Sequence, residues 1–208
     1  MVSFVYFDLG GVVILDFSGT DKWAQLKKEL GIAADRYAEF DSFFNEREPE
    51  ICSGVDVETL LPDIKERFDV RLPAGYSLLE GFVKRFEANK SIWPIIYNAH
   101  KKYRVGLLTN MYPNMFNSIN KHGIMPDLKW DVIIDSSIER IQKPDKKIFE
   151  LGETRANIKG NEIFFVDNNK KNVVAADNIG WKTFLYDPAD CVKSNNNISK
   201  ILFRNEMS

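Results

Sequence analysis

The sequence predicts an α/β protein with a parallel sheet that has helices on both faces, together with a small α-helical unit. Five short apolar runs each end at polar residues, and helical patterns lie between the later runs. A helical stretch of about ninety residues separates the first run from the second. Continuous rather than alternating hydrophobicity is typical of strands covered on both faces. Strands that alternate with helices form βα units.

The apolar runs are the predicted strands, and the side chains that follow them are the first candidates for chemistry. In an open α/β sheet the ligand crevice lies beyond the carboxyl ends of the strands. We therefore expect the polar residues after the strands to gather at one edge. The predicted strands cover residues 4–7 before Asp8, 105–108 before Thr109 and Asn110, 132–134 before Asp135, 163–166 before Asp167, and 183–186 before Asp187.

Four apolar faces with helical spacing lie between the first two strands, and they begin near Trp23, Tyr37, Leu60 and Leu79. A helical insert at this place would lie over the crevice. We therefore expect an α/β core domain made of residues 1–15 and 91–208, and a helical cap domain made of residues 16–90.

Three further local expectations concern the later part of the chain. We expect Pro144 in the first turn of a helix and Gly180 at the end of another. The biased segment 194–197 is expected to form a surface turn before a short terminal helix.

The composition favours a cytoplasmic protein with a small-molecule ligand. Lys and Arg (28) nearly balance Asp and Glu (30), which argues against nucleic acid or an anionic membrane as the main partner. No apolar run approaches the roughly 20 residues of a membrane span, and residues 1–7 do not resemble a secretion signal. Cys52 and Cys191 are expected to be reduced thiols. The sequence has two histidines, His100 and His122, which argues against a zinc site or a Ser-His-Asp triad.

Four short motifs carry the predicted chemistry, and all of them contain groups that suit a phosphate or a hard cation. Asp8 ends a strand and is followed by two glycines, which tolerate a tight turn. Thr109 and Asn110 can both donate hydrogen bonds to a phosphate oxygen. Lys143 precedes a predicted helix start, where an anion is favoured. Asp167 ends a buried strand with a carboxylate suited to a hard cation.

With these motifs in this order, the chain resembles the haloacid dehalogenase (HAD)-like hydrolase superfamily, in particular phosphatases with an α-helical cap after the first strand. The resemblance covers nearly the full length and implies a Rossmann-like core. It also implies that Asp8 is the nucleophile, which forms an aspartyl-phosphate that water later hydrolyses. Thr109 corresponds to the phosphate-binding hydroxyl and Lys143 to the cation that balances the transferred phosphoryl group. Asn110 is expected beside the substrate, a small phosphorylated metabolite.

The resemblance also implies Mg²⁺ as the cofactor. Its predicted ligands are the carboxylates of Asp8 and Asp167 and the backbone carbonyl of Gly10. Asn168 stands where these phosphatases commonly have a second acid. Its amide can still coordinate the ion or hold a ligating water, but it brings one negative charge fewer.

A second departure from the family pattern is Gly10, at the position where these phosphatases usually have an aspartate that acts as general acid and base. Loss of such a group typically lowers the rate on the order of 10² to 10⁴-fold. The sequence therefore predicts a phosphatase that is slow or selective for good leaving groups, unless water or a cap residue supplies the proton.

Two alternatives remain open. One is a degenerate domain that binds phosphate or a protein partner without turnover, which the changes at Gly10 and Asn168 favour. The other is a 2-haloacid dehalogenase, because those relatives also lack the second aspartate. Asp167 argues against a dehalogenase, since the corresponding motif there is serine-rich and metal-free.

Overall fold

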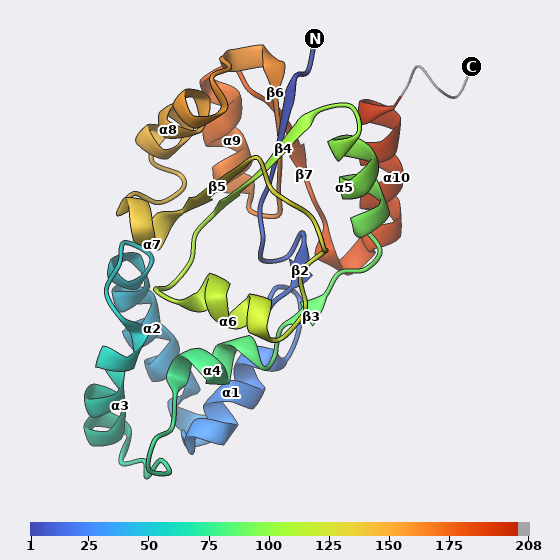
Figure 1. The fold of residues 1–208 in the computed structure, drawn as a ribbon. Helices are drawn as coiled ribbons and strands as arrows, with labels where there is room; N and C mark the ends of the chain where they lie inside the picture. Colours follow the sequence, from blue (N-terminus) through green and yellow to red (C-terminus); the bar gives the residue numbers. More distant parts are fainter. Residues whose placement is uncertain (204–208) are drawn as a thin grey trace.

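The computed structural model describes residues 1–203. Its centre is a five-stranded sheet with helices on both faces, and further helices lie beyond the carboxyl ends of the strands (Figure 1). All neighbouring strands run parallel. In spatial order they are β5 (Val132–Asp135), β4 (Arg104–Thr109), β1 (Phe4–Phe7), β6 (Ile163–Asp167) and β7 (Lys182–Leu185). The predicted fold class is confirmed, and each predicted strand agrees with the observed one to within one residue at each end.

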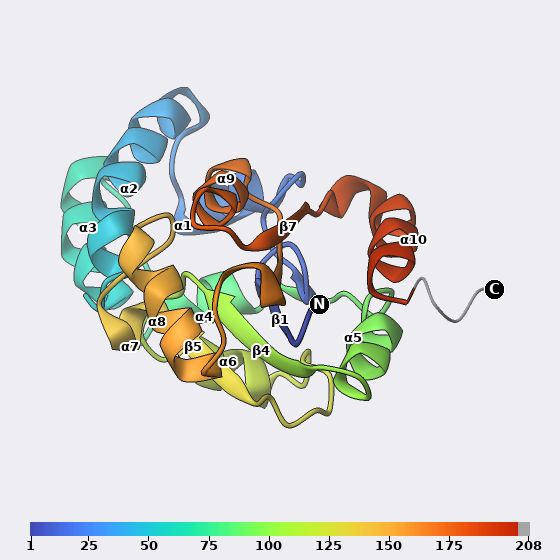
Figure 2. The same cartoon turned by 90° about the horizontal axis from the view of Figure 1, so that it is seen from above.

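Successive side chains of the central strand β1 enter two different hydrophobic clusters. Phe4 and Tyr6 belong to the cluster that includes residues of α8 (Lys146–Ala156) and α9 (Lys170–Asn178). Val5 and Phe7 belong to the cluster that includes residues of α5 (Trp93–His100) and α10 (Cys191–Leu202). Figures 1 and 2 show these helix pairs on opposite faces of the sheet. Because both faces are covered, all four residues of β1 are apolar.

A helical insert follows the first strand and lies at the lower end of the molecule in Figure 1. It begins after β2 (Ile14–Leu15) and ends before β3 (Glu87–Ala88), which pairs with β2 in antiparallel fashion. The antiparallel pair brings the two ends of the insert together. Its helices are α1 (Lys22–Leu30), α2 (Tyr37–Ile51), α3 (Leu61–Phe68) and α4 (Leu78–Val83). Within residues 1–203, four 3₁₀ turns occur, at Ala34–Arg36, Val57–Leu60, Gly160–Glu162 and Pro188–Asp190.

Aromatic side chains form the centre of the insert. The Trp23 ring lies 5.0 Å from Phe44, 5.7 Å from Phe40 and 6.1 Å from Phe82, measured between centroids. These rings come from α1, α2 and α4. They therefore hold the helices of the insert together, as the apolar spacing of the sequence predicts.

Two local predictions are wrong. Pro144 does not lie in the first turn of a helix: α8 begins at Lys146, where the Asp145 side chain accepts a hydrogen bond from the Lys147 N–H. A capping carboxylate thus determines the start of this helix, in place of the proline. Residues 194–197 do not form a turn, because they lie inside α10. Ser194 and Asn195 are buried there, so tertiary packing overrides their weak helix propensity.

Two further short helices complete the fold, α6 (Met115–Lys121) after β4 and α7 (Ser136–Glu139) after β5. Among residues 1–203, no helix combines the length and the apolar character that a membrane crossing requires.

Candidate active site

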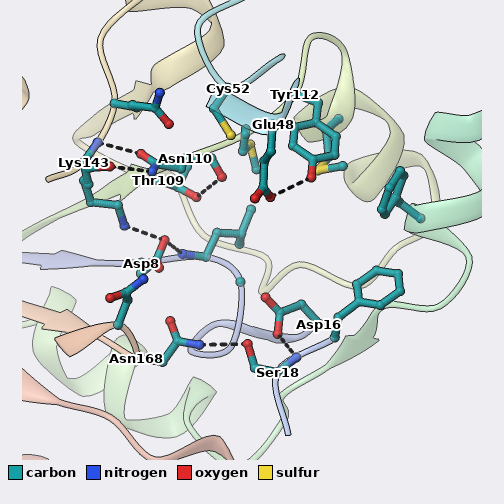
Figure 3. Close-up of a pocket in the computed structure, with 18 of the residues that line it drawn as sticks. Asp8, Asp16, Ser18, Glu48, Cys52, Thr109, Asn110, Tyr112, Lys143 and Asn168 are labelled. Atoms are coloured by element: carbon teal, nitrogen blue, oxygen red, sulfur yellow. Dashed lines mark hydrogen bonds and ion pairs between the residues drawn. The ribbon is translucent and has the colours of Figure 1, made fainter. Parts of the chain in front are cut away.

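Asp8 is the first residue after β1, and its carboxylate lines a cavity at the carboxyl edge of the sheet (Figure 3). One carboxylate oxygen, Oδ1, accepts a hydrogen bond from the Leu9 N–H at 2.7 Å and lies 2.9 Å from the Lys143 ammonium. Within the described part of the chain, no hydrogen bond reaches the other oxygen, Oδ2. The side chain is therefore held by one oxygen, while the second can react or bind a cation.

Lys143 lies between two carboxylates. Its Nζ is 2.9 Å from Asp8 Oδ1 and 2.6 Å from Asp167 Oδ2, and it also donates to the Leu108 carbonyl at 2.9 Å. An ammonium group has three donors, and all three have acceptors here. The side chain is 1% exposed, so solvent does not screen these contacts. The three predicted charged residues thus meet at one point.

The pKa values of Asp8 and Lys143 reflect this arrangement. Burial and the nearby Asp167 carboxylate raise the pKa of Asp8 to about 7, although Lys143 acts in the opposite direction. Burial alone would lower the pKa of Lys143, but the Asp167 and Asp8 carboxylates outweigh it and raise that pKa. Lys143 is therefore a permanent cation, whereas Asp8 can hold a proton near neutral pH when no other cation is present.

Asp167 is completely buried at the end of β6. Its Oδ2 accepts from Lys143, its Oδ1 accepts from the Asn169 N–H at 2.7 Å, and the Asn172 amide reaches both oxygens at 3.1 and 3.2 Å. This carboxylate therefore orients Lys143 beside Asp8. A direct bond from Asp167 to a metal stays a prediction, and it would require one of these hydrogen bonds to be exchanged.

Thr109 is the last residue of β4 and Asn110 follows it, and both line the same cavity. The Asn110 amide holds the backbone of Lys143 from both sides: its Nδ2 donates to the Lys143 carbonyl at 2.9 Å, and its Oδ1 accepts from the Lys143 N–H at 2.8 Å. Asn110 is thus observed as a positioning residue for Lys143. Its predicted contact with substrate and the phosphate contact of Thr109 stay predictions.

The cavity has a volume of about 730 Å³, room for a small metabolite. Core residues form one wall and residues of the insert form the other, so substrate would lie between them. From the insert, Glu48 on α2 accepts a hydrogen bond at 3.0 Å from the Tyr112 hydroxyl of the core. Figure 3 shows this pair across the cavity from Asp16, Ser18 and Asn168.

The oxygen atoms around Asp8 suit a hard divalent cation. Asp8, Gly10 and Asn168 line the cavity together, and no described residue hydrogen-bonds Asp8 Oδ2 or Asn168 Oδ1. Carboxylate, carbonyl and amide oxygens are the ligands that Mg²⁺ prefers. The residues present therefore fit the predicted ion, although residues 1–203 contain no group of three or more His, Cys, Asp or Glu able to bind a metal.

Gly11 is required beside Asn168 for two reasons. Its φ of +73° lies in the left-handed region, and a Cβ at this position would come within 2.0 Å of Asn168 Nδ2. The glycine after Gly10 thus lets the Asn168 side chain approach the turn that carries Asp8.

Asp16, which lines the cavity just after β2, is not part of the four sequence motifs. Burial raises the pKa of its carboxyl group, and the Ser18 N–H only partly offsets this. The signal available in the sequence was a second aspartate eight residues after Asp8, at the end of the apolar run 12–15. That run is too short to reveal by itself that the chain turns back toward Asp8.

Residues 4–180 match the family model of haloacid dehalogenase-like hydrolases. This match spans most of the chain. The chain belongs to the haloacid dehalogenase-like hydrolase family. The family predicted from the four motifs is therefore confirmed.

Solved structures with the same fold support the architecture of this haloacid dehalogenase-like hydrolase. A family enzyme from Bacteroides thetaiotaomicron, a variant in complex with magnesium and inorganic phosphate, has a TM-score of 0.73 at 17% identity, covering 90% of this chain and 95% of its own. A predicted HAD-like hydrolase from Porphyromonas gingivalis has a TM-score of 0.73 at 21% identity, covering 98% of both chains. L-2-haloacid dehalogenase from Xanthobacter autotrophicus has 0.65 at 14%, covering 100% and 85%. At these identities the likeness shows the fold alone.

A curated relative from mouse, acyl-CoA dehydrogenase family member 10, is 32% identical over 105 residues. The match covers 49% of this hydrolase chain and 10% of the mouse protein. The chain thus corresponds to a small part of that longer protein.

Proposed function

We propose that this hydrolase is a Mg²⁺-dependent phosphatase that acts on a small phosphorylated metabolite through an aspartyl-phosphate on Asp8. The observation that carries the proposal is the position of the Lys143 ammonium, 2.9 Å from Asp8 and 2.6 Å from Asp167, beside an Asp8 oxygen that no described residue hydrogen-bonds. A carboxylate attacks a phosphate dianion readily only when the phosphate charge is balanced. Lys143 provides such a charge, in a place that its partners fix.

The residues of the chain would share the work as follows. Asp8 Oδ2 attacks phosphorus, and Lys143 balances the charge of the phosphoryl group that moves toward it. Asp167 and Asn110 hold Lys143 in place through the contacts described above. Among the described residues, the Thr109 hydroxyl donates only to the Asn110 carbonyl, at a long 3.5 Å, so it is available to donate to a phosphate oxygen.

Asp8, the Gly10 carbonyl and Asn168 would hold Mg²⁺, with Asp167 as a further predicted ligand. The ion would supply additional positive charge to the phosphate group and shield it from Asp8. One negative charge fewer at Asn168 predicts weaker binding of the ion than two adjacent acids would give.

We further propose the division into a core domain (1–15 and 91–208) and a cap domain (16–90). The pairing of β2 with β3, which joins the two ends of the insert, supports this division. A cytoplasmic location is also part of the proposal. Cys52 and Cys191 are both unpaired thiols, as is usual in a reducing compartment.

The proposal is tested by assaying the full chain with Mg²⁺ on acyl, aryl and sugar phosphates, and by trapping phosphorylated protein. We expect Asp8→Asn to lower turnover on the order of 10³-fold or more, because it removes the nucleophile. Asp187→Asn is the matched control: this exposed aspartate also follows a strand, β7, but does not line the cavity. It should keep wild-type activity.

The same assay separates the alternatives. A chelator should abolish phosphate release. Phosphate binding without release from any ester would indicate a degenerate domain. Chloride release from 2-chloropropionate that is indifferent to the chelator would indicate a dehalogenase.

A further inference from the structure

Hydrolysis of a phosphate ester through Asp8 requires a group that moves protons. The leaving alkoxide needs a proton when the P–O bond breaks, and the water that later attacks the aspartyl-phosphate must lose one. Gly10 has no side chain to do this. Lys143 has all three donors engaged with other groups. The proton must therefore come from water or from another group in the cavity wall.

The Asp16 carboxylate occupies the space where a side chain of residue 10 would lie. A Cβ built on Gly10 would stand 2.6 Å from Asp16 Oδ2 and 3.4 Å from its carboxyl carbon. Gly10 does not have a positive φ, so the backbone itself would accept a side chain there. Asp16, in effect, fills that volume from a different point of the chain. Two residues span at most about 7 Å, which keeps this volume close to Asp8.

Local contacts hold Asp16 in this orientation and leave one oxygen available. Its Oδ1 accepts a hydrogen bond from the Ser18 N–H at 2.8 Å, and the Ser18 hydroxyl accepts one from the Asn168 amide at 3.1 Å. The Ser18 N–H and hydroxyl both favour the charged carboxylate, and no hydrogen bond among residues 1–203 is assigned to Oδ2. Asp16 is therefore fixed through Ser18 to Asn168, the residue after Asp167, while its free oxygen faces the turn that carries Asp8.

The other carboxylate in the cavity wall is less suitable. Glu48 accepts a hydrogen bond from the Tyr112 hydroxyl at 3.0 Å, and Figure 3 shows this pair across the cavity from Asp16. Glu48 and Asp16 each have one oxygen that accepts a hydrogen bond and one that accepts none among residues 1–203, so their positions distinguish them. Asp16 is favoured because its carboxylate lies against Gly10, two residues after Asp8.

We propose that Asp16 is the general acid and base of this enzyme, an inference that rests on the phosphatase function proposed above. In the first step Asp8 Oδ2 forms a bond to phosphorus, the electron pair of the ester P–O bond passes to the leaving oxygen, and that oxygen takes the proton of Asp16. In the second step water attacks phosphorus and gives a proton to Asp16. The P–O bond to Asp8 breaks, and its electron pair returns to the Asp8 carboxylate.

The main test compares Asp16→Asn with wild type on phosphates of graded leaving-group pKa. Wild type should show a shallow dependence. In Asp16→Asn we expect turnover of alkyl phosphates to fall on the order of 10² to 10⁴-fold, whereas phosphorylation of Asp8 by an acyl phosphate changes little, because that leaving group needs no proton. The phosphorylated variant should also accumulate, since its hydrolysis lacks a base. The ratio of the rates with the two substrates is measured on one protein sample, so partial misfolding lowers both rates equally and leaves the ratio unchanged.

Matched variants sharpen the result. Asp35→Asn alters an exposed aspartate of the insert outside the cavity and should leave the ratio unchanged. Gly10→Asp added to Asp16→Ala places a carboxylate on the other side of the same volume. We expect this double variant to turn over alkyl phosphates at least about tenfold faster than Asp16→Ala alone, because a general acid is restored.

The outcomes separate this inference from the function it rests on. If wild type neither releases phosphate nor becomes phosphorylated on Asp8, both are overturned. If turnover depends on Asp8 but Asp16→Asn keeps the wild-type dependence on leaving group, the role of Asp16 alone is overturned. A selective loss in Glu48→Gln without one in Asp16→Asn would overturn it as well.

Discussion

The ammonium group of Lys143 is buried away from solvent, and the two carboxylates beside it stabilise its charge there. Bringing an ammonium group into the interior is unfavourable unless charged and polar partners replace water. Asp8, Asp167 and the Leu108 carbonyl provide these partners at 2.6–2.9 Å. The two carboxylates depend on the ammonium group in turn, because they are close enough to repel each other when it is removed.

We therefore expect Lys143→Ala to be strongly destabilising. Breaking a buried ion pair by removing one partner typically costs about 3–5 kcal/mol of unfolding free energy, since uncompensated charge stays buried. Urea denaturation at pH 8 measures it. The control is Lys146→Ala, which removes the exposed Lys146–Glu150 pair at 2.8 Å and should change stability little. Equal losses in both variants would contradict this account of the site.

Asp8 also predicts how Mg²⁺ binding depends on pH. Its pKa is raised to about 7 in the metal-free protein, whereas a metal ligand must be ionised. Below that pKa, binding of the ion displaces a proton. We expect the affinity to increase by up to about tenfold per pH unit from about pH 5 to 7 and to level off above. Calorimetric titration in buffers of different ionisation enthalpy checks this. An affinity independent of pH, or an equal increase in Asp8→Asn, would show that Asp8 does not release the proton.

At the scale of secondary-structure elements, α8 is the helix that follows the Lys143 loop, and its packing fixes the end of that loop. Gly152 lies where α8 meets Trp181 and Tyr6. A Cβ at this position would come within 2.8 Å of the Trp181 ring, and the Tyr6 hydroxyl donates to the Gly152 carbonyl at 2.9 Å. The glycine allows the helix to approach the sheet closely.

Gly152→Ala should therefore destabilise the protein, although alanine favours an isolated helix. Overpacking of a dense core typically costs about 1–3 kcal/mol, which exceeds the gain in helix propensity of up to about 1 kcal/mol. The comparison is Thr154→Ala on the exposed side of α8, expected to change unfolding free energy by less than about 0.5 kcal/mol. Thermal or urea unfolding measures both, and a stabilised Gly152→Ala would refute the close-packing argument.

Helices and strands could be predicted from the sequence where the apolar pattern of one continuous segment shows which residues are buried. The central strands β1, β4 and β6 are largely apolar because both faces are covered, and polar residues at strand ends meet because parallel strands share one carboxyl edge. Asp8 and Asp167 were predicted at this edge for that reason, and Lys143 was predicted from its motif before an expected helix start. The structure brings the three together.

What the sequence did not reveal depends on pairing between distant segments. The two-residue strands β2 and β3 pair across the whole insert, and neither has a periodic pattern long enough to detect. Asp16 follows β2, so the sequence did not reveal that its side chain lies against Gly10 either. The same holds for the buried Ser194 and Asn195 of α10. Ser194 accepts a hydrogen bond from the Asp187 N–H, and Asn195 accepts one from the Tyr186 hydroxyl.

Considered as a whole, the molecule has one hydrophobic cluster that crosses from the sheet into the insert. The cluster includes Val5 and Phe7 of β1 together with Leu26, Phe40 and Ile64 of the insert. Additional polar contacts join α2 to the core, because the Cys52 carbonyl accepts from the Ser136 hydroxyl at 2.6 Å. The insert therefore shares its apolar interior with the core.

This continuity predicts that insert and core unfold together. In a variant that keeps Trp23 alone, with phenylalanine replacing Trp93, Trp130 and Trp181, fluorescence reports on the insert and far-UV circular dichroism reports on the entire chain. We expect the two urea transitions to coincide, because exposing the insert would also expose apolar surface of the core. A variant that keeps Trp181 alone provides the same comparison from the opposite face of the sheet. A Trp23 transition at distinctly lower urea than the circular dichroism transition would show instead that the insert unfolds as an independent unit.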